Sequence, residues 1–368
     1  MSSITNNLDP VEIKKFSDKN PEEILYNNLY KKFGDRYVEY RKRYERNLKS
    51  LDVNEQTSYP NTVVLELVNR CNLACPFCKQ WARNDAEKST VDDDVLDKLF
   101  EDFEKNKLNS LMLTLSEPLL YKNINKVLDR AKEAKIMDVF LFTNGALLNE
   151  KNAKMILDSC ITRLFISIDA FSKETYDKVR IPVAKRLYNT NRLKDLEDNI
   201  VRFMNLRSEF KRELPLVRTS FLAFKENKSE INDFVNKWKK IVDSVEIQMD
   251  MVPSFEMKDK NSIKKNTESW YKEIVGKPVK DLTKDDNKKY SCREPWSQMA
   301  VYADGTIVPC CTPFGKNIPV GNIKNESITE AWNGAEITKV RDAFNNNTPN
   351  EVCKTCIDHT TTVTNGIF

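Results

Sequence analysis

The sequence predicts an α/β protein whose main part is a partial (β/α)6 TIM-like barrel. A helical N-terminal extension and a small cysteine-rich C-terminal domain are expected to flank it. Three features predict this fold. Strand-like apolar runs alternate with amphipathic helical segments from residue 62 to about 252. The first sixty residues are polar and helical in character, and the cysteines after residue 290 lie in a region of low regularity.

Six strand-like runs define the predicted barrel, and they cover residues 62–68, 110–115, 137–142, 162–168, 216–223 and 245–252. Apolar residues at helical one-face spacing lie between them, for example Val95, Leu96, Leu99, Phe100 and Phe103. Six β/α units imply a parallel sheet with helices outside, and right-handed crossovers would curl that sheet into an open barrel. Functional residues then belong at the C-terminal ends of the strands.

The chain divides into four predicted parts. Residues 1–60 form the helical extension, 61–255 the barrel, 256–290 a linker and 291–368 the small C-terminal domain. Pro21 predicts the start of a helix, and Tyr26, Leu29, Tyr30 and Phe33 follow at helical spacing. We expect the aromatic side of this extension to pack on the barrel. The linker is rich in Lys, Asp, Asn and Ser, with one helix expected around residues 270–275.

Composition excludes several classes of protein. The net charge of +4 comes from 59 basic and 55 acidic residues, and this near balance argues against a nucleic-acid partner. No apolar run resembles a signal peptide or a membrane span, and nine cysteines in clusters indicate a reducing cytoplasm with metal cofactors. With His359 as the single histidine, serine, cysteine and most zinc hydrolase mechanisms are disfavoured.

The segment Cys71-Asn72-Leu73-Ala74-Cys75-Pro76-Phe77-Cys78 follows the first predicted strand. Three thiolates at C-x3-C-x2-C spacing can hold three corners of a cubane iron–sulfur cluster and leave the fourth iron without a protein ligand. An open iron can bind a small molecule, so the motif indicates chemistry. Structural zinc is the first alternative, but a fourth local ligand is lacking. A disulfide framework fits poorly with a chain of this length.

A second group of cysteines comprises Cys292, Cys310, Cys353 and Cys356. Four thiolates close a cubane cluster completely, and zinc is the alternative for such a site. A β-hairpin with an Asp304-Gly305 turn is predicted between the first two of them. Three further side chains are not counted among these ligands: Cys311 is a spare thiol or a substitute ligand, Cys160 belongs to the core, and His359 belongs to a solvated tail.

Together, the first cysteine loop, the strand order and the second cysteine group resemble the radical S-adenosylmethionine (SAM) superfamily with a SPASM/twitch extension, over about residues 62 to 368. The resemblance implies two 4Fe–4S clusters. Cys71, Cys75 and Cys78 would hold the one whose open iron chelates SAM, and the second group of four cysteines would hold a single auxiliary cluster. In this superfamily an electron from the first cluster cleaves SAM to a 5′-deoxyadenosyl radical, which abstracts a hydrogen atom from the substrate.

The resemblance also implies contacts to SAM. Ser116 and Glu117 match the segment that binds the SAM ammonium, although Leu115 and Ser116 replace its usual glycines. The other implied SAM contacts are Phe77 near the adenine, Asn144 in a turn facing the site, Ser167 at the ribose, Arg180 at the carboxylate and Gln248 near the adenine. Asn144 and Arg180 also have simpler readings, as a plain turn residue and an exposed helix-end residue. Asp169 and Glu294 are the candidates for the catalytic proton acceptor.

The expected substrate is a small polar metabolite of the sugar, cyclitol or nucleotide-sugar type. The expected reaction is a two-electron oxidation to a ketone with the auxiliary cluster as electron acceptor. The expected reductant is of the flavodoxin or ferredoxin type. A maturase that modifies a ribosomal peptide stays open, although the N-terminal region has no strand pattern typical of a peptide-recognition domain. A non-catalytic iron–sulfur electron carrier or redox sensor is the remaining alternative.

Overall fold

The computed structural model describes residues 12–13, 20–49, 57–78, 89–223, 226–249, 290–311, 316–354 and 356–357. Its centre is a sheet of ten strands in the order β1-β7-β6-β5-β4-β3-β2-β8-β9-β10. Six consecutive parallel strands form the barrel part: β2 (Thr62–Leu65), β3 (Ser110–Leu113), β4 (Asp138–Thr143), β5 (Arg163–Ser167), β6 (Leu216–Ala223) and β7 (Ser244–Met249). These confirm the six predicted strands.

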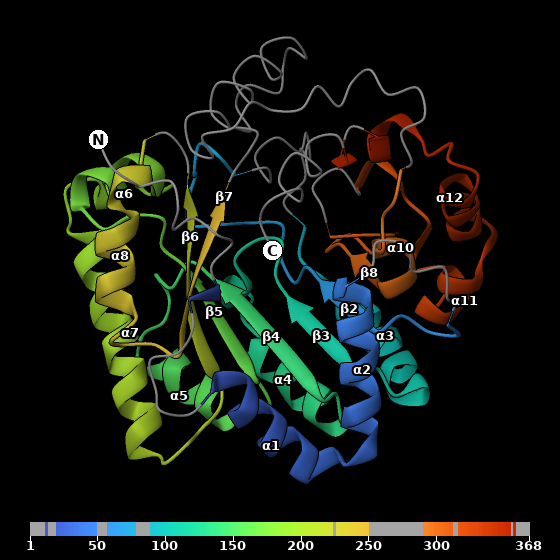
Figure 1. Cartoon of the computed structure of the whole chain (residues 1–368), viewed down its shortest axis with the longest axis horizontal. Helices are drawn as coiled ribbons and strands as arrows, with labels where there is room; N and C mark the ends of the chain where they lie inside the picture. Colours follow the sequence, from blue (N-terminus) through green and yellow to red (C-terminus); the bar gives the residue numbers. More distant parts are fainter. Residues whose placement is uncertain are drawn as a thin grey trace.

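Helices cover the outer face of this sheet, as the amphipathic spacing predicts (Figure 1). They are α3 (Asp93–Asn106), α4 (Ile124–Glu133), α5 (Glu150–Asp158), α6 (Lys173–Val179), α7 (Arg192–Glu209) and α8 (Ile231–Trp238), with short 3₁₀ turns at Pro118–Leu120, Lys185–Leu187 and Lys228–Glu230. One set of alternating strand residues, such as Leu111, Leu164 and Val217, packs with the helices in the main core. The other set faces inward, because successive side chains of a strand point to opposite faces.

The N-terminal region is a pair of helices, α1 (Pro21–Phe33) and α2 (Asp35–Lys49). Asn20 caps α1 by accepting a hydrogen bond from the backbone N–H of Glu22 at 3.2 Å. Aromatic and apolar side chains of both helices pack with Met137 and Leu216, next to or at the start of β4 and β6. The pair therefore closes the N-terminal end of the inward face, on the side opposite to α4 and α5 (Figure 1).

A short strand in the N-terminal region was not expected. β1 (Glu12–Ile13) pairs antiparallel with β7 and becomes the edge of the sheet. The expectation that this region has no strand is therefore wrong. Two alternating residues are too few for a periodic signal, and β1 is defined by the free edge of β7 and not by its own sequence pattern.

The C-terminal region continues the barrel sheet. β8 (Gln298–Val301) pairs parallel with β2, and the hairpin to β9 (Thr306–Val308) turns at Gly305 with φ of 89°, which confirms the predicted Asp-Gly turn. The other elements are β10 (Gly321–Asn322), α10 (Glu294–Ser297), α11 (Ile328–Asn333) and α12 (Ala335–Asn345). Cys292 and Cys310 thus flank a hairpin whose first strand is bonded directly to β2, the strand that precedes the first cysteine loop.

Two expectations fall outside the described residues: the helix around 270–275 and the position of His359. Within the described part of the chain, no helix combines the length and the apolar character needed to cross a lipid bilayer.

Candidate active site and metal centres

The first cysteine loop lies at the C-terminal end of β2, where the barrel rule places functional residues. A short antiparallel contact with the segment after α6 holds it. The backbone N–H of Ala74 donates to the carbonyl of Ile181 at 2.7 Å, and that of Val183 donates to the carbonyl of Asn72 at 3.0 Å. Because these bonds flank Leu73, the loop has a fixed course between its first two cysteines.

The three thiols of this loop lie close enough to influence one another electrostatically. Burial raises the pKa of Cys71 to about 11 and that of Cys75 to about 12, so both thiols keep their protons at neutral pH unless a metal displaces them. Two N–H donors face them. The amide of Asn144 lies 3.6 Å from Cys71 Sγ, and a guanidinium nitrogen of Arg180 lies 3.8 Å from Cys75 Sγ.

Donors of this kind stabilise thiolate ligands and tune a bound cluster. In the described part of the chain, no three His, Cys, Asp or Glu side chains converge as closely as a single metal ion requires. An iron–sulfur cluster spreads its ligands over separate iron atoms. The loop, its buried thiols and their N–H donors therefore fit a cluster held by Cys71, Cys75 and Cys78.

Glu117, the predicted ligand of the SAM ammonium, is a buried carboxylate between β3 and the 3₁₀ turn at Pro118–Leu120. It accepts hydrogen bonds from Thr143 Oγ1 at 2.8 Å, from the Asn144 N–H at 2.9 Å and from the Leu119 N–H at 3.2 Å. Burial raises its pKa to about 6, although these bonds act in the opposite direction. A carboxylate offers about four acceptor positions, so one is left for a ligand.

The residues that replace the usual glycines still follow a glycine-like course. Leu115 has φ of 75°, in the left-handed region that glycine enters without steric cost. Leu115 therefore adopts a backbone conformation that favours glycine, despite its side chain. Ser116 donates from Oγ to Glu66 at 3.1 Å, and Glu66 also accepts from the Ala303 N–H at 3.2 Å.

Glu66 was not predicted as a site residue. It is a buried carboxylate directly after β2, and it links the Ser116 segment to the hairpin of the C-terminal region. A charged residue at the end of an otherwise apolar strand was the available signal in the sequence.

Arg180 and Asp169 form a buried ion pair beside the cysteine loop. The Asp169 carboxylate holds the pKa of Arg180 above its usual value, against the effect of burial. Asp169 also accepts from the Leu222 N–H at 2.8 Å. Asp169, directly after β5, thus binds both Arg180 and the backbone of β6. Its role as a proton acceptor stays a prediction. The reading of Arg180 as an exposed helix-end residue is wrong, because its side chain is 9% exposed.

Arg180 retains binding capacity. Its Nε–H is buried and has no acceptor among the described residues, and its guanidinium lies over the Phe77 ring at 5.5 Å. An acceptor such as a carboxylate would satisfy the unpaired N–H. Three predicted SAM contacts lie in segments that reach this edge of the sheet: Phe77 for the adenine, Ser167 for the ribose and Arg180 for the carboxylate.

Ser167 and Gln248 lie on the inward face near the C-terminal ends of β5 and β7. Ser167 is partly exposed and pairs in register with Ser220, and Gln248 is exposed and pairs with Leu222. Gly145, in the turn after Asn144, has φ of 72°, and a side chain there would overlap Leu196 and Ile166. The turn therefore requires glycine at position 145, and it places Asn144 within hydrogen-bonding distance of both Cys71 and Glu117.

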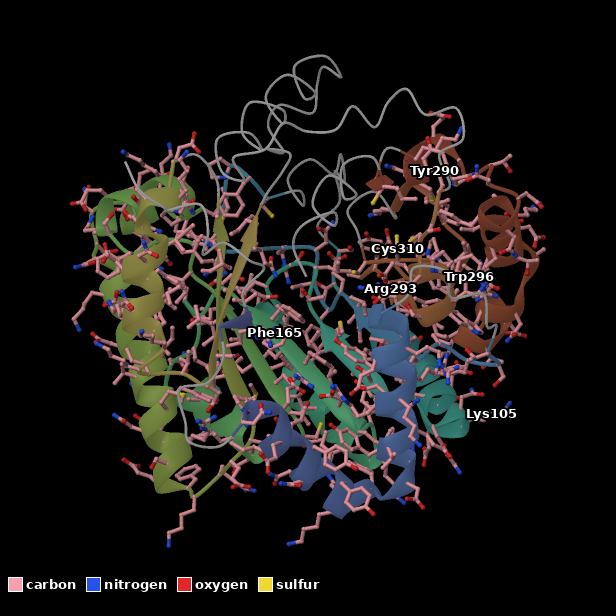
Figure 2. All side chains as sticks on the ribbon, viewed as in Figure 1. Lys105, Phe165, Tyr290, Arg293, Trp296 and Cys310 are labelled. Carbon is pink, nitrogen blue, oxygen red and sulfur yellow. The ribbon has the colours of Figure 1, made fainter. Side chains whose placement is uncertain are left out.

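The four cysteines of the second group also come together. Cys292 is coupled electrostatically to Cys310 and Cys356, and Cys353 is coupled to the same two. Burial raises the pKa of Cys353 to about 12. Figure 2 shows Cys310 near Arg293 and Trp296, which belong to the segment that begins at Cys292. Four mutually close thiols from three separate segments fit a fully ligated cluster.

Cys311 and Glu294 border this group. The thiol of Cys311 accepts a hydrogen bond from the Gln298 amide at 3.3 Å and packs with Val64 and Ala300 on the inward face of the sheet. Glu294, at the start of α10, has a pKa raised by burial and an Arg293 nitrogen at 3.5 Å. Glu294 therefore lies beside the second cysteine group, and its role in proton transfer stays a prediction.

Two family models match the chain. The model for the radical SAM superfamily matches residues 65–218, and the model for an iron–sulfur cluster-binding domain, SPASM, matches residues 292–357. A probable GTP 3′,8-cyclase of Methanococcus maripaludis is 28% identical over 117 residues, which is 32% of this chain and 39% of that protein. The match thus spans about two fifths of that relative's length.

Solved structures with the same fold include Streptococcus suis SuiB bound to S-adenosylmethionine, with a TM-score of 0.53 and 14% identity over 82% of this chain and 72% of that one. Native anSMEcpe with bound AdoMet and the Cp18Cys peptide also has a TM-score of 0.53, with 19% identity over 80% of this chain and 86% of that one. At these identities the similarity establishes the fold.

Proposed function

We propose that this chain, which matches the radical SAM model over residues 65–218 and the SPASM iron–sulfur model over residues 292–357, is a radical SAM enzyme that oxidises a secondary alcohol of a small polar substrate to a ketone. The substrate class is a sugar, cyclitol or nucleotide sugar. When bound, the first cluster and SAM supply the radical that removes a hydrogen atom from the substrate. The second cluster is the proposed acceptor of the remaining electron.

One observation carries the proposal for the site. The cysteine loop, Glu117, Ser167 and Arg180 lie at one edge of the sheet, where Asn144 connects the loop to Glu117 by hydrogen bonds. We assign Glu117 to the SAM ammonium, through its remaining acceptor position, and Arg180 to the SAM carboxylate, through its unpaired Nε–H. Thr143 and Asp169 position these two groups by the bonds already described.

The preference for a small substrate has a structural basis. The helices α1 and α2 pack at the N-terminal end of the inward face, away from the edge that carries the cysteine loop. In the described chain they form no separate module at the cysteine edge that could receive a peptide. A peptide substrate is the second candidate, because anSMEcpe, with the same fold, has been solved with a peptide bound.

Anaerobic reconstitution tests the proposed function directly. Protein loaded with iron and sulfide is expected to contain two 4Fe–4S clusters and to form 5′-deoxyadenosine when SAM and dithionite are added. Iron per chain and 5′-deoxyadenosine by mass spectrometry are the measurements. Loaded protein that forms no 5′-deoxyadenosine would support the electron-carrier alternative.

The raised pKa of Glu117 predicts how SAM binding depends on pH. The carboxylate is mostly ionised at pH 7, but with a pKa of about 6 only about a quarter is ionised at pH 5.5. If the ionised form alone binds the ammonium, the affinity for SAM is expected to fall roughly fourfold from pH 7 to pH 5.5. Equilibrium dialysis with the cluster-loaded protein measures this change.

The Glu117→Gln variant is the control for this titration. It keeps the size of the side chain but has no carboxylate to protonate, so its weaker affinity is expected to be flat over the same pH range. A variant whose affinity falls in parallel with the native protein would assign the pH dependence to another group.

A further inference from the structure

The inward face of the barrel carries partly exposed side chains at two levels: Ser220 and Glu246 are in register with Ser167, and Arg218 and Ser244 lie one step below them. Along β6, the helix-facing residues Val217, Thr219 and Phe221 are buried, whereas the inward-facing Arg218 and Ser220 are partly exposed. The same holds on β7 for Ser244 and Glu246. Inward side chains of these strands therefore border accessible space, while the outer side chains belong to the core.

Below this layer the barrel is closed. Arg163 on β5 forms ion pairs with Glu22 of α1, at 2.7 Å, and with Asp138 of β4, at 3.5 Å. Its guanidinium also lies over the Phe140 ring at 5.2 Å, and Asp138 accepts from Tyr40 of α2 at 2.9 Å. Arg163 and Asp138 are thus ion-paired within the protein, and Arg218 and Glu246 are the charged side chains above them that a substrate would meet. We call the surface formed by Arg218, Glu246 and Phe165 the floor.

On that floor, Arg218 is held in a defined orientation. Its Nε donates to Ser244 Oγ at 3.1 Å, and its guanidinium lies over the Phe165 ring at 4.8 Å. A terminal nitrogen lies 3.6 Å from a carboxylate oxygen of Glu246, which is longer than a hydrogen bond. A guanidinium has five N–H donors, and the bond to Ser244 uses one of them, so several remain available to a ligand. Figure 2 shows Phe165 over the middle of the sheet.

The aromatic part of the floor extends to β4. The rings of Phe142 and Phe165 are 4.8 Å apart at an interplanar angle of 84°, and Phe142 is partly exposed. The floor thus offers an aromatic surface beside one cationic donor group and one anionic acceptor group.

The pairing of opposite charges selects against ions. A substrate anion would be attracted by Arg218 but repelled by Glu246 at a similar distance. A substrate cation would be attracted by Glu246 but repelled by Arg218. A hydroxyl group both donates and accepts, so two adjacent hydroxyls can accept from Arg218 and donate to Glu246 without a charge penalty. The C–H face of a ring can cover the phenylalanines by apolar contact.

We propose that Arg218 and Glu246 bind adjacent hydroxyl groups of a cyclic polyol, a sugar or cyclitol ring, whose C–H face packs on Phe142 and Phe165. This inference rests on the proposed function and names its substrate site. Arg218 precedes Ser220 by two residues, and Phe165 precedes Ser167 by two, which is a rise of about 6.6 Å along a parallel strand. A ring held between Arg218 and Glu246 would therefore reach the level of Ser167, because Glu246 is in register with Ser220 and Ser220 with Ser167.

Deuterium transfer tests the site. Cluster-loaded enzyme, SAM and dithionite are incubated with perdeuterated myo-inositol, perdeuterated glucose or a C-deuterated serine-containing peptide, and 5′-deoxyadenosine is analysed by mass spectrometry. We expect deuterium from a polyol. Loss of a charge-assisted hydrogen bond in Arg218→Met or Glu246→Gln is expected to raise the KM for that polyol roughly 10- to 100-fold.

Arg130→Met is the matched control, because Arg130 also lies over a phenylalanine ring, Phe100 at 5.0 Å, and pairs with Asp97, but on the outer helices. Its KM is expected to equal that of the native enzyme. Deuterium from the peptide alone, from none of the probes, or from a polyol with unchanged KM in both floor variants would overturn the inference. In each of these cases 5′-deoxyadenosine still forms, which separates this failure from that of the proposed function.

Discussion

Replacing Cys71, Cys75 and Cys78 together by alanine is expected to abolish 5′-deoxyadenosine formation while about half of the iron remains. The three thiols are the proposed ligands of the SAM-binding cluster, and Cys292, Cys310, Cys353 and Cys356 form a separate group on the C-terminal region. If each group holds one cubane of four irons, the variant keeps the second and loses the first. Iron, sulfide and 5′-deoxyadenosine per chain are the measurements.

Cys160→Ala is the control for this triple variant. Cys160 is a partly buried thiol that donates to the carbonyl of Leu128 at 3.4 Å, and it packs against the main core. Its removal is expected to leave iron content and SAM cleavage unchanged. A triple variant that retained all its iron, or that still cleaved SAM, would contradict the assignment of the first loop.

The barrel strands could be predicted from the sequence because each carries a signal of its own. β6 has β-branched or apolar residues at alternating positions, Val217, Thr219 and Phe221, and its predicted bounds, 216–223, are those observed. β2 ends at Leu65, three residues before its predicted end, because the backbone beyond it changes partners. There, Val68 bridges Thr90 and Val91 donates to the carbonyl of Leu67. An apolar run does not reveal such a change of partner.

Contacts between distant segments could not be predicted. The sequence near Gln298 does not indicate that its strand pairs with β2. The turn residues of the hairpin are equally compatible with a separate small domain. In the same way, the sequence predicts separate roles for Asp169, as a proton acceptor, and for Arg180, as a ligand of the SAM carboxylate. Their ion pair depends on the geometry of the β5–α6 connection, which spacing along the chain does not fix.

The ion pair between Asp169 and Arg180 is expected to contribute strongly to the stability of the protein. Asp169→Asn is expected to lower the free energy of unfolding by about 3–5 kcal/mol, because it leaves the buried Arg180 without its counter-ion. Asparagine suits the position, since residue 169 has φ of 62° and asparagine tolerates the left-handed region. Backbone strain is therefore not the source of the loss. Denaturant titration under anaerobic conditions measures the change against the native protein.

The double variant Asp169→Asn/Arg180→Met separates stability from function. Removing both charges takes away the unpaired guanidinium, so most of the lost stability is expected to return. SAM cleavage is expected to be lost in the double variant, because the Nε–H proposed to bind the SAM carboxylate is gone. If the double variant recovered SAM cleavage together with stability, Arg180 would be a structural residue and the carboxylate would be bound elsewhere. If the single variant were as stable as the native protein, the pair would instead be solvated enough for water to replace the lost carboxylate.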